Sequence, residues 1–281
     1  MAQIGVFRQR DFDPGAYVVA LFHAQQALAD TPHRLTLHTF HGDDLQARAE
    51  ASGVDALLVF GPGLRDLDFL RSATRPSLVC ERILEGCSYL APDNYDMGKT
   101  AARHLIELGH TRIADVLPGE RATLGVYHGT RLRGFLETCA ALGHAVPDER
   151  VYFGSKDSEG GTATAARLLR DRPLPTAIYA QNLPMMLGLL HVLQQRTIRV
   201  PDEVSIVGTS FMQMNAPEAA EHTSPPITIV TFQKERMGSE GVRYLLDRLE
   251  GRTAGLLQAL LPGVLVQRAS TAPVRAPAEA R

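Results

Sequence analysis

Short apolar runs alternate with longer segments of helical period, and this alternation constrains the fold more than any other feature of the sequence. Runs that are apolar almost throughout are typical of strands buried on both faces of a parallel sheet. The expected strands are Ile4–Phe7, Leu35–Phe40, Ala56–Phe60, Ser77–Cys80, Ile113–Leu117, Val151–Phe153, Ala177–Ala180 and Val204–Val207. The expected helices are Gly15–Ala29, Asp96–Leu108, Thr130–Leu142, Gly160–Arg170, Pro184–Gln195 and Glu235–Glu250. Repeated strand–helix units of this kind predict an α/β fold with parallel sheets.

The helix expected over Asp96–Leu108 carries clear start and stop signals. Asp93 and Asn94 are side chains of the type that caps a helix N-terminus. Gly109 suits the left-handed position that follows a helix end. Pro184 likewise suits the first turn of its helix.

The length of 281 residues corresponds to roughly two domains of about 150 residues each. The sequence therefore predicts two Rossmann-like lobes with a ligand cleft between them. Ligands of parallel sheets bind beyond the carboxyl ends of the strands, so the segments after the expected strands form the candidate site. These segments are Arg8–Asp13, Gly61–Gly63, Glu81-Arg82, Pro118–Arg131, Gly154–Asp157, Gln181-Asn182 and Gly208–Phe211.

Composition and charge exclude several classes of protein. The formal net charge of −2 disfavours nucleic-acid binding by this chain alone, because such affinity comes mostly from cationic contacts to phosphate. No apolar run reaches the length of about 18 residues that a membrane helix needs. The first residues lack the basic-then-apolar pattern of a signal peptide, so we expect none. The 3 cysteines lie apart and are odd in number, which argues against a disulfide scaffold and favours a reducing cytoplasm.

Chemical motifs give no support for catalysis. Gly61-Pro62-Gly63 lacks the third glycine of a dinucleotide-binding turn, and Gly208–Phe211 fails as a nucleophile elbow. His33, His38 and His41 match no standard zinc spacing. We therefore expect a protein that is not an enzyme and that has no metal site and no cofactor. Glu81-Arg82 has two open interpretations, a ligand contact or an ion pair within one lobe.

Several strings resemble, in order and spacing, the effector-binding core of the lactose-repressor (LacI/GalR) family of bacterial transcription regulators. The resemblance extends over about residues 4–273 and ends in a segment similar to the family's closing strand. The strings are Asp93–Leu105, Glu107–Ile113, Arg131–Phe135, Pro175–Asn182, Met185–Gly188, Arg199–Gly208, Pro225–Val230, Met237-Gly238 and Val266–Pro273.

The resemblance implies a periplasmic-binding-protein-like fold with two lobes joined by three crossovers. It also implies an approximate lobe map. The N-terminal lobe would comprise Gln3–Leu117 and Ile229–Gly251, and the C-terminal lobe Pro118–Thr228 and Arg252–Ala272. The remaining residues, Pro273–Arg281, would form a flexible tail.

The resemblance also assigns residues to an effector site in the C-terminal lobe. The family arginine that hydrogen-bonds the effector falls at Arg131, three residues before a Gly-Phe pair. Asn182 keeps the amide of a family Asn-Asp pair, while Leu183 replaces the carboxylate. Ser210 replaces a second family aspartate, after Thr209 in the place of an aromatic residue. Because those carboxylates commonly bind sugar hydroxyls, their loss predicts ligands other than neutral monosaccharides.

The loop after the first strand adds unusual charge to this site. Arg8 and Arg10, together with Arg131, favour an anionic effector such as a sugar acid or a sugar phosphate. Asp13 closes the same loop. Phe12 has two open interpretations, stacking on a sugar face or packing against its own lobe.

The function implied is the effector-binding and dimerisation core of a transcription regulator, expected to be a cytoplasmic homodimer and a repressor. Its effector would be a small sugar-like metabolite, and binding would close the two lobes. Operator DNA would be bound only through an N-terminal helix-turn-helix, which this chain does not include, and we expect no membrane partner. The alternatives are a transport-type periplasmic solute-binding protein and an enzyme on a similar fold.

Overall fold

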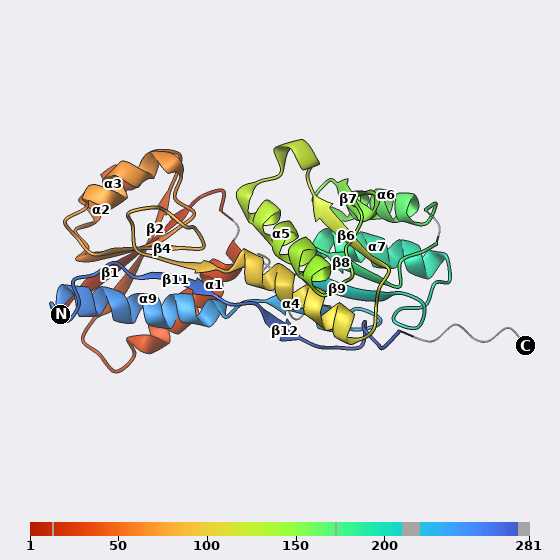
Figure 1. The fold of residues 1–281 in the computed structure, drawn as a ribbon. Coiled ribbons are helices and arrows are strands. Elements are labelled where there is room, and N and C mark those ends of the chain that lie inside the picture. The colour runs from red at the N-terminus through yellow and green to blue at the C-terminus, as the bar shows by residue number, and fades with distance from the viewer. Residues whose placement is uncertain (13, 172, 210–219, 275–281) are drawn as a thin grey trace, which may run out of the picture. The chain divides into compact units, whose positions relative to one another are not determined.

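The computed structural model describes residues 1–12, 14–171, 173–209 and 220–274, and these residues divide into two compact units (Figure 1). Unit 1 comprises, among the described residues, 1–92 and 233–261. Unit 2 comprises 93–209, 220–232 and 262–274. Each unit is built around its own 6-stranded sheet.

The sheet of unit 1 has helices on both faces. Its strand order is β11 (Gln258–Leu261), β5 (Tyr89–Pro92), β4 (Ser77–Cys80), β3 (Ala56–Phe60), β1 (Gln3–Gln9) and β2 (Arg34–Phe40). The helices are α1 (Pro14–Ala27), α2 (Leu45–Ser52), α3 (Leu67–Ser72) and α9 (Lys234–Leu249), with a 3-10 turn at Leu64–Asp66. Leu57 and Val59 of β3 pack in one core cluster with residues of α2 and α3, whereas Leu58 lies beside α9. Burial on both faces explains why β3 is apolar at every position.

The sheet of unit 2 is built in the same way. Its strand order is β12 (Val264–Val266), β10 (Thr228–Thr231), β9 (Ser205–Thr209), β8 (Ala177–Ala180), β6 (Ile113–Pro118) and β7 (Val151–Gly154). The helices are α4 (Asn94–Glu107), α5 (Val126–Ala141), α6 (Ser158–Leu168) and α7 (Leu183–Gln195), with 3-10 turns at Arg121–Thr123 and Asp148–Arg150. Strand pairs in both sheets are parallel apart from the antiparallel pair β10–β12. The predicted α/β class with parallel sheets is confirmed.

The division into units differs from the lobe map that the resemblance implied. Residues 93–117 belong to unit 2, because β6 pairs with β7 and β8 in the second sheet. β10 also lies in the second sheet, and β11 lies in the first sheet beside β5. Sheet membership depends on long-range pairing, which adjacency along the chain does not reveal.

Helices pack in pairs that meet at glycines. A Cβ atom added at Gly98 of α4 would overlap the backbone oxygen of Arg131, and one added at Gly134 of α5 would overlap that of Tyr95. This contact brings the backbones of α4 and α5 together and so fixes the position of Arg131 of α5 relative to α4. Glycines in equivalent contacts are Gly161 and Gly188 between α6 and α7, and Gly238 of α9 against α1.

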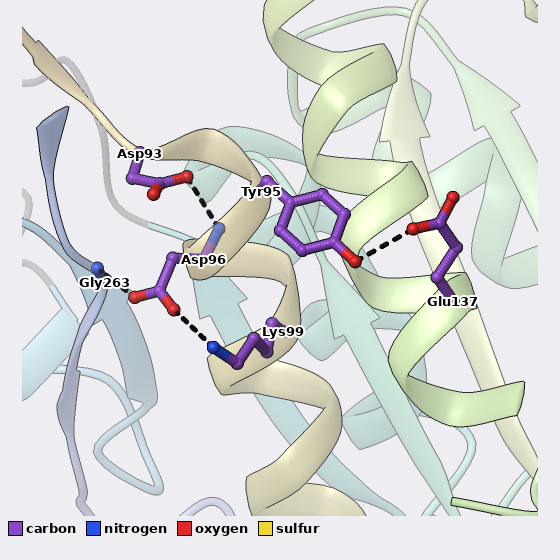
Figure 2. Close-up of polar contacts among 6 residues, drawn as sticks. All are labelled: Asp93, Tyr95, Asp96, Lys99, Glu137 and Gly263. Atoms are coloured by element: carbon purple, nitrogen blue, oxygen red, sulfur yellow. Dashed lines mark hydrogen bonds and ion pairs between the residues drawn. The ribbon is translucent and has the colours of Figure 1, made fainter. Parts of the chain in front are cut away.

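The start of α4 is held by the side chains drawn in Figure 2. Asp93 caps the helix by accepting from the backbone N of Asp96 at 2.9 Å. The Asp96 carboxylate accepts from Lys99 Nζ at 3.2 Å and from the backbone N of Gly263 at 3.0 Å, which ties α4 to the chain entering β12. Tyr95 donates to Glu137 of α5 at 2.9 Å. At the other end Gly109 has a φ of 84°, so the predicted cap and stop signals are both confirmed.

Helices α4 and α9 each have one buried face and one polar face, as do other helices that cover a sheet. Met97, Ala101 and Leu105 form the buried stripe of α4. Within the part of the chain that the structure describes, no helix is both long enough and apolar enough to cross a membrane.

Candidate functional site

Arg131 lies in the first half of α5 and is only 1% exposed. Its Nε and Nη2 atoms donate to Oδ1 of Asn94 at 3.3 and 2.7 Å. Its Nη1 atom donates to the backbone oxygen of Gln181 at 3.1 Å. Asn94 is the first residue of α4 and Gln181 follows β8, so the guanidinium connects two helices to the carboxyl end of a central strand. Burial lowers the pKa of Arg131, yet an arginine stays charged at neutral pH.

Asp115 is fully buried in the middle of β6, next to this arginine. Its Oδ2 atom accepts from Nε2 of Gln181 at 2.7 Å. Burial raises the pKa of Asp115 to about 8, against the smaller lowering effects of the Gln181 hydrogen bond and the Arg131 charge. The carboxyl group therefore holds its proton at neutral pH.

His128 lies one turn before Arg131 on α5. Burial, and then the charge of Arg131, lower the pKa of His128 to about 4, so its imidazole is neutral at pH 7. Nδ1 of His128, Oδ1 of Asp115 and Oε1 of Gln181 are buried polar atoms with no hydrogen-bond partner. Oε1 of Gln181 can accept a hydrogen bond from a polar ligand or from water, and Oδ1 of the protonated Asp115 carboxyl group can donate one. We call Asn94, Asp115, His128, Arg131 and Gln181 the Arg131 cluster.

Asn182 follows directly on this cluster at the end of β8. Its side-chain oxygen accepts from the backbone N of Met185 at 3.0 Å and so caps α7. Leu183, which stands in place of the family carboxylate, packs in the core of unit 2. An effector contact by Asn182 stays a prediction.

Tyr179 and Thr209 form a second buried contact at this end of the sheet. The Tyr179 hydroxyl lies 2.6 Å from the Thr209 hydroxyl, and the Tyr179 ring packs on Phe135 of α5. Thr209, in place of the family aromatic residue, thus has a partner within its own sheet. Ser210 and Asp13, both expected in the site, lie outside the described residues.

Of the expected residues of unit 1 that the structure describes, Arg8 lies near the end of β1, and Arg10 and Phe12 lie in the loop that follows it. Arg8 donates through Nη1 to the backbone oxygens of Phe12 at 2.9 Å and Arg10 at 3.5 Å, and it lies 5.5 Å from the centre of the Tyr17 ring. The Phe12 ring occupies the space that a Cβ atom at Gly61 would need. Arg10 is exposed. The structure thus places Phe12 against its own unit, while a ligand contact by any of these residues stays a prediction.

Glu81 follows β4 at the corresponding end of the first sheet. It is buried and its φ is 66°, a left-handed conformation that is uncommon outside glycine. Strained residues of this kind concentrate at functional sites. Both interpretations of Glu81-Arg82 stay open.

An open pocket of about 580 Å³ lies at the other end of unit 2. Its walls come from the C-terminal half of α7 and from the segments around Arg199 and Pro225. Because Asn182 caps the opposite end of α7, this pocket is separate from the Arg131 cluster.

Sequence reasoning selected Arg131 but missed three of its neighbours. Asp115 lies in a run that the sequence analysis interpreted as an apolar strand. A carboxylate within such a run is itself a signal of a functional site. Asn94 was interpreted as a cap, whereas Asp93 provides the cap and Asn94 binds Arg131. His128 had no motif that distinguished it.

Two α/β units, each built around its own largely parallel sheet, define the class as a two-unit α/β protein. Residues 102–271 match the periplasmic binding protein-like domain, and the chain belongs to this family.

Two curated relatives and one solved structure indicate the branch of this family. The HTH-type transcriptional regulator CelR of Thermobifida fusca is 34% identical over 186 residues, which cover 66% of this chain and 52% of CelR. The HTH-type transcriptional repressor PurR of Haemophilus influenzae is 30% identical over 165 residues, which cover 59% of this chain and 47% of PurR. The structure of a CelR–cellobiose complex has a TM-score of 0.77 at 28% identity, and the match covers 95% of this chain and 84% of that one.

The predicted resemblance to LacI-type effector-binding cores is confirmed by these similarities. The relatives are transcription regulators and not enzymes. The chain spans about half the length of the curated relatives it matches.

Proposed function

We propose that the chain is the effector-binding and dimerisation core of a cytoplasmic LacI-type regulator that represses transcription in response to a small sugar-like metabolite. The observation that carries this proposal is the Arg131 cluster, at the carboxyl end of β8 in a chain similar to transcription regulators. Operator DNA would be bound by a helix-turn-helix of the kind for which the relatives are named. The core itself would carry out no catalysis.

The proposed effector carries hydroxyl groups and a negative charge. The planar guanidinium of Arg131 offers donors in a fixed fork, which suits vicinal hydroxyls or a carboxylate. Asn182 and Ser210 would complete the contacts from unit 2, and Arg8, Arg10, Phe12 and Asp13 would complete those from unit 1. The cellobiose bound by the similar CelR supports a sugar-like ligand. Arg8 near the end of β1 and Arg10 in the loop after it support an acidic one.

A ligand panel tests this proposal. Cellobiose, D-glucose, D-glucuronate and glucose 6-phosphate would be screened by thermal shift, followed by calorimetry of those that stabilise the protein. We expect acidic sugars to bind more tightly than their neutral counterparts. Good binding of neutral sugars with none of acidic sugars would contradict the acidic effector.

A matched pair of variants tests the role of Arg131. Arg131→Gln should weaken the binding of any active ligand at least about tenfold, because a charged hydrogen bond is lost. Arg133→Gln is the control, since Arg133 is on the same helix but exposed beside Tyr95. Equal affinities of the two variants would exclude Arg131 from the site.

The proposed homodimer uses exposed apolar side chains of unit 1. Leu37 is 57% exposed on β2, an edge strand of its sheet, and Phe22 is 59% exposed on α1. An exposed apolar edge strand invites pairing with a second copy. Light scattering after size exclusion should give a dimer, and Leu37→Lys should give a monomer. A monomeric wild type would favour the alternative of a transport-type solute-binding protein, which the relatives disfavour. Lobe closure on the effector stays a prediction.

A further inference from the structure

Asp115 is an acidic residue in a strand that is otherwise apolar. Every residue of β6 is buried. Ala114 and Val116 point to the core cluster that includes residues of α6 and α7, so Asp115 points to the opposite face of the sheet. A carboxyl group buried there costs stability unless it is neutral or paired. Packing alone does not account for an acidic residue at this place.

Asp115 is connected to Arg131 in two ways. An ionised Asp115 attracts the charge of Arg131, which lowers the pKa of Asp115 and raises that of Arg131 against the larger effect of burial. They are also joined by Gln181, whose side chain donates to Asp115 at 2.7 Å and whose backbone oxygen accepts from Arg131 at 3.1 Å. A change at Asp115 is therefore transmitted to Gln181, which holds the guanidinium of Arg131.

The other groups around Asp115 are neutral at pH 7. Tyr179 is its register partner on β8, and Cys139 comes from α5. Burial raises the pKa of both, so neither carries charge. The partner on β7 is Val151, and α4 contributes the Asn94 amide through Arg131. Arg131 and Asp115 thus determine the charge on this side of the sheet.

We propose that Asp115 is a positioning residue that sets the charge of the effector site. When Asp115 is protonated, the Arg131 cluster binds the anionic group of a sugar acid. Once the proton is lost, the cluster disfavours that group. This inference rests on the proposed function and specifies its ligand class.

The direction of the effect follows from electrostatics. The pKa of Asp115 is held at about 8 by burial, so the carboxyl group ionises as the pH rises above 8. Ionisation adds one negative charge that competes with an anionic ligand for Arg131. By linkage, an anionic ligand also stabilises the protonated form of Asp115. A neutral sugar has no charge to compete with, so its affinity should change little.

Calorimetry with two sugars and two proteins tests this inference. D-glucuronate and D-glucose differ in one group, and the carboxylate of glucuronate is ionised at both pH 6.5 and pH 9. Asp115→Asn keeps the shape and an acceptor for Gln181 but cannot ionise. For the wild type, the affinity for glucuronate should fall about tenfold between the two pH values, while that for glucose stays constant. For Asp115→Asn, the affinity for glucuronate should change less than about twofold.

Failure of the inference and failure of the proposed function give different results. If both proteins lose affinity for glucuronate by the same factor, Asp115 does not set the charge and the inference is wrong. If neither sugar binds at either pH, the proposed ligand class is wrong. Unfolding without ligand then decides the inference, because the wild type should lose stability relative to Asp115→Asn as the pH rises from about 4 to about 8, with no further loss above 8. Parallel stability curves of the two proteins would overturn it.

Discussion

The two units hold their candidate arginines in different ways. Arg131 of unit 2 is 1% exposed and donates to the Asn94 side chain and the Gln181 backbone, which belong to different elements. Arg8 of unit 1, near the end of β1, donates to backbone oxygens of the loop that follows, and Arg10 in that loop is exposed. A buried guanidinium is part of the fold as well as of the site, whereas a loop arginine acts mainly through its charge. Substitution of Arg10 in unit 1 should therefore change ligand binding with little change in stability. Substitution of Arg131 in unit 2 should change both.

The largest expected effect is the loss of stability on removing Arg131. Arg131→Ala should lower the free energy of unfolding by about 3 kcal/mol, because it leaves a cavity and buried acceptors without their donor. Arg10→Ala should change it by less than about 0.5 kcal/mol, since the side chain is exposed. Urea denaturation followed by circular dichroism measures both. Similar losses in the two variants would remove the distinction between the units.

The contact between α4 and α5 offers a way to disturb Arg131 without touching it. A Cβ atom at Gly134 would overlap the backbone of Tyr95, so Gly134→Ala should destabilise the protein by about 2 kcal/mol. It should also weaken ligand binding, because α5 shifts against Asn94. Gly129→Ala on the same helix is the control, since its nearest contact would be Leu124 at 4.0 Å. That variant should be neutral or stabilising by about 0.5 kcal/mol. Equal denaturation midpoints for the two variants would argue against this packing.

A pH effect should arise from two buried histidines of unit 2. His104 shares a hydrogen bond with Thr271 at 3.0 Å, and His110 donates to the backbone oxygen of Ala272 at 3.0 Å. Burial lowers the pKa of both imidazoles below the ordinary 6.5. As the pH falls, these histidines are protonated at a higher pH in the unfolded chain than in the folded protein. The stability present above pH 6.5 is therefore lost as the pH falls below 6.5.

Equilibrium unfolding between pH 7 and pH 5 measures this effect. The wild type should lose stability relative to a His104→Gln, His110→Gln double variant as the pH falls. The exposed His191 on α7 provides the control substitution His191→Gln, which should follow the wild type. An identical pH dependence of all three proteins would show that the buried pair does not titrate as expected.

The smallest effect is expected from Arg10, in the loop after β1 of unit 1. Arg10→Gln should weaken the binding of an acidic sugar about twofold to threefold at low ionic strength. The difference should vanish in about 0.5 M salt, because exposed charges are screened over a few ångströms. Calorimetry at two salt concentrations measures it. An effect independent of salt would place Arg10 in direct contact with the ligand.

The sequence predicted the parts of the fold that depend on local patterns. The Asp93 cap, the stop at Gly109 and Pro184 in the first turn of α7 follow from the conformational preferences of single residues. Four strands, β5, β10, β11 and β12, were missed, since each has at most four residues. β11 and β12 are also only partly buried. Their sheets, and that of β6, are set by pairing between distant segments. Local patterns cannot specify such pairing.

Prediction of the candidate site reached Arg131 through a motif but did not reach its surroundings. Asp115 interacts with Arg131 only because β6 and α5 lie together, whereas His128 lies one turn before Arg131 on α5 itself. The shifted pKa values of Asp115 and His128 arise mainly from burial. Burial of a polar side chain depends on the whole fold. The local sequence around Asp115 predicts only that a strand passes there.

The central claim is that Arg131 binds the effector of this regulator core. NMR of the arginine side chains tests it most directly, with a ligand that the panel has identified. The Arg131 Nε–H signal, assigned by its loss in Arg131→Gln, should shift on saturation more than that of the control Arg133, and Arg131→Gln should lose at least about tenfold in affinity. An unshifted Arg131 signal together with unchanged affinity of the variant would contradict the account.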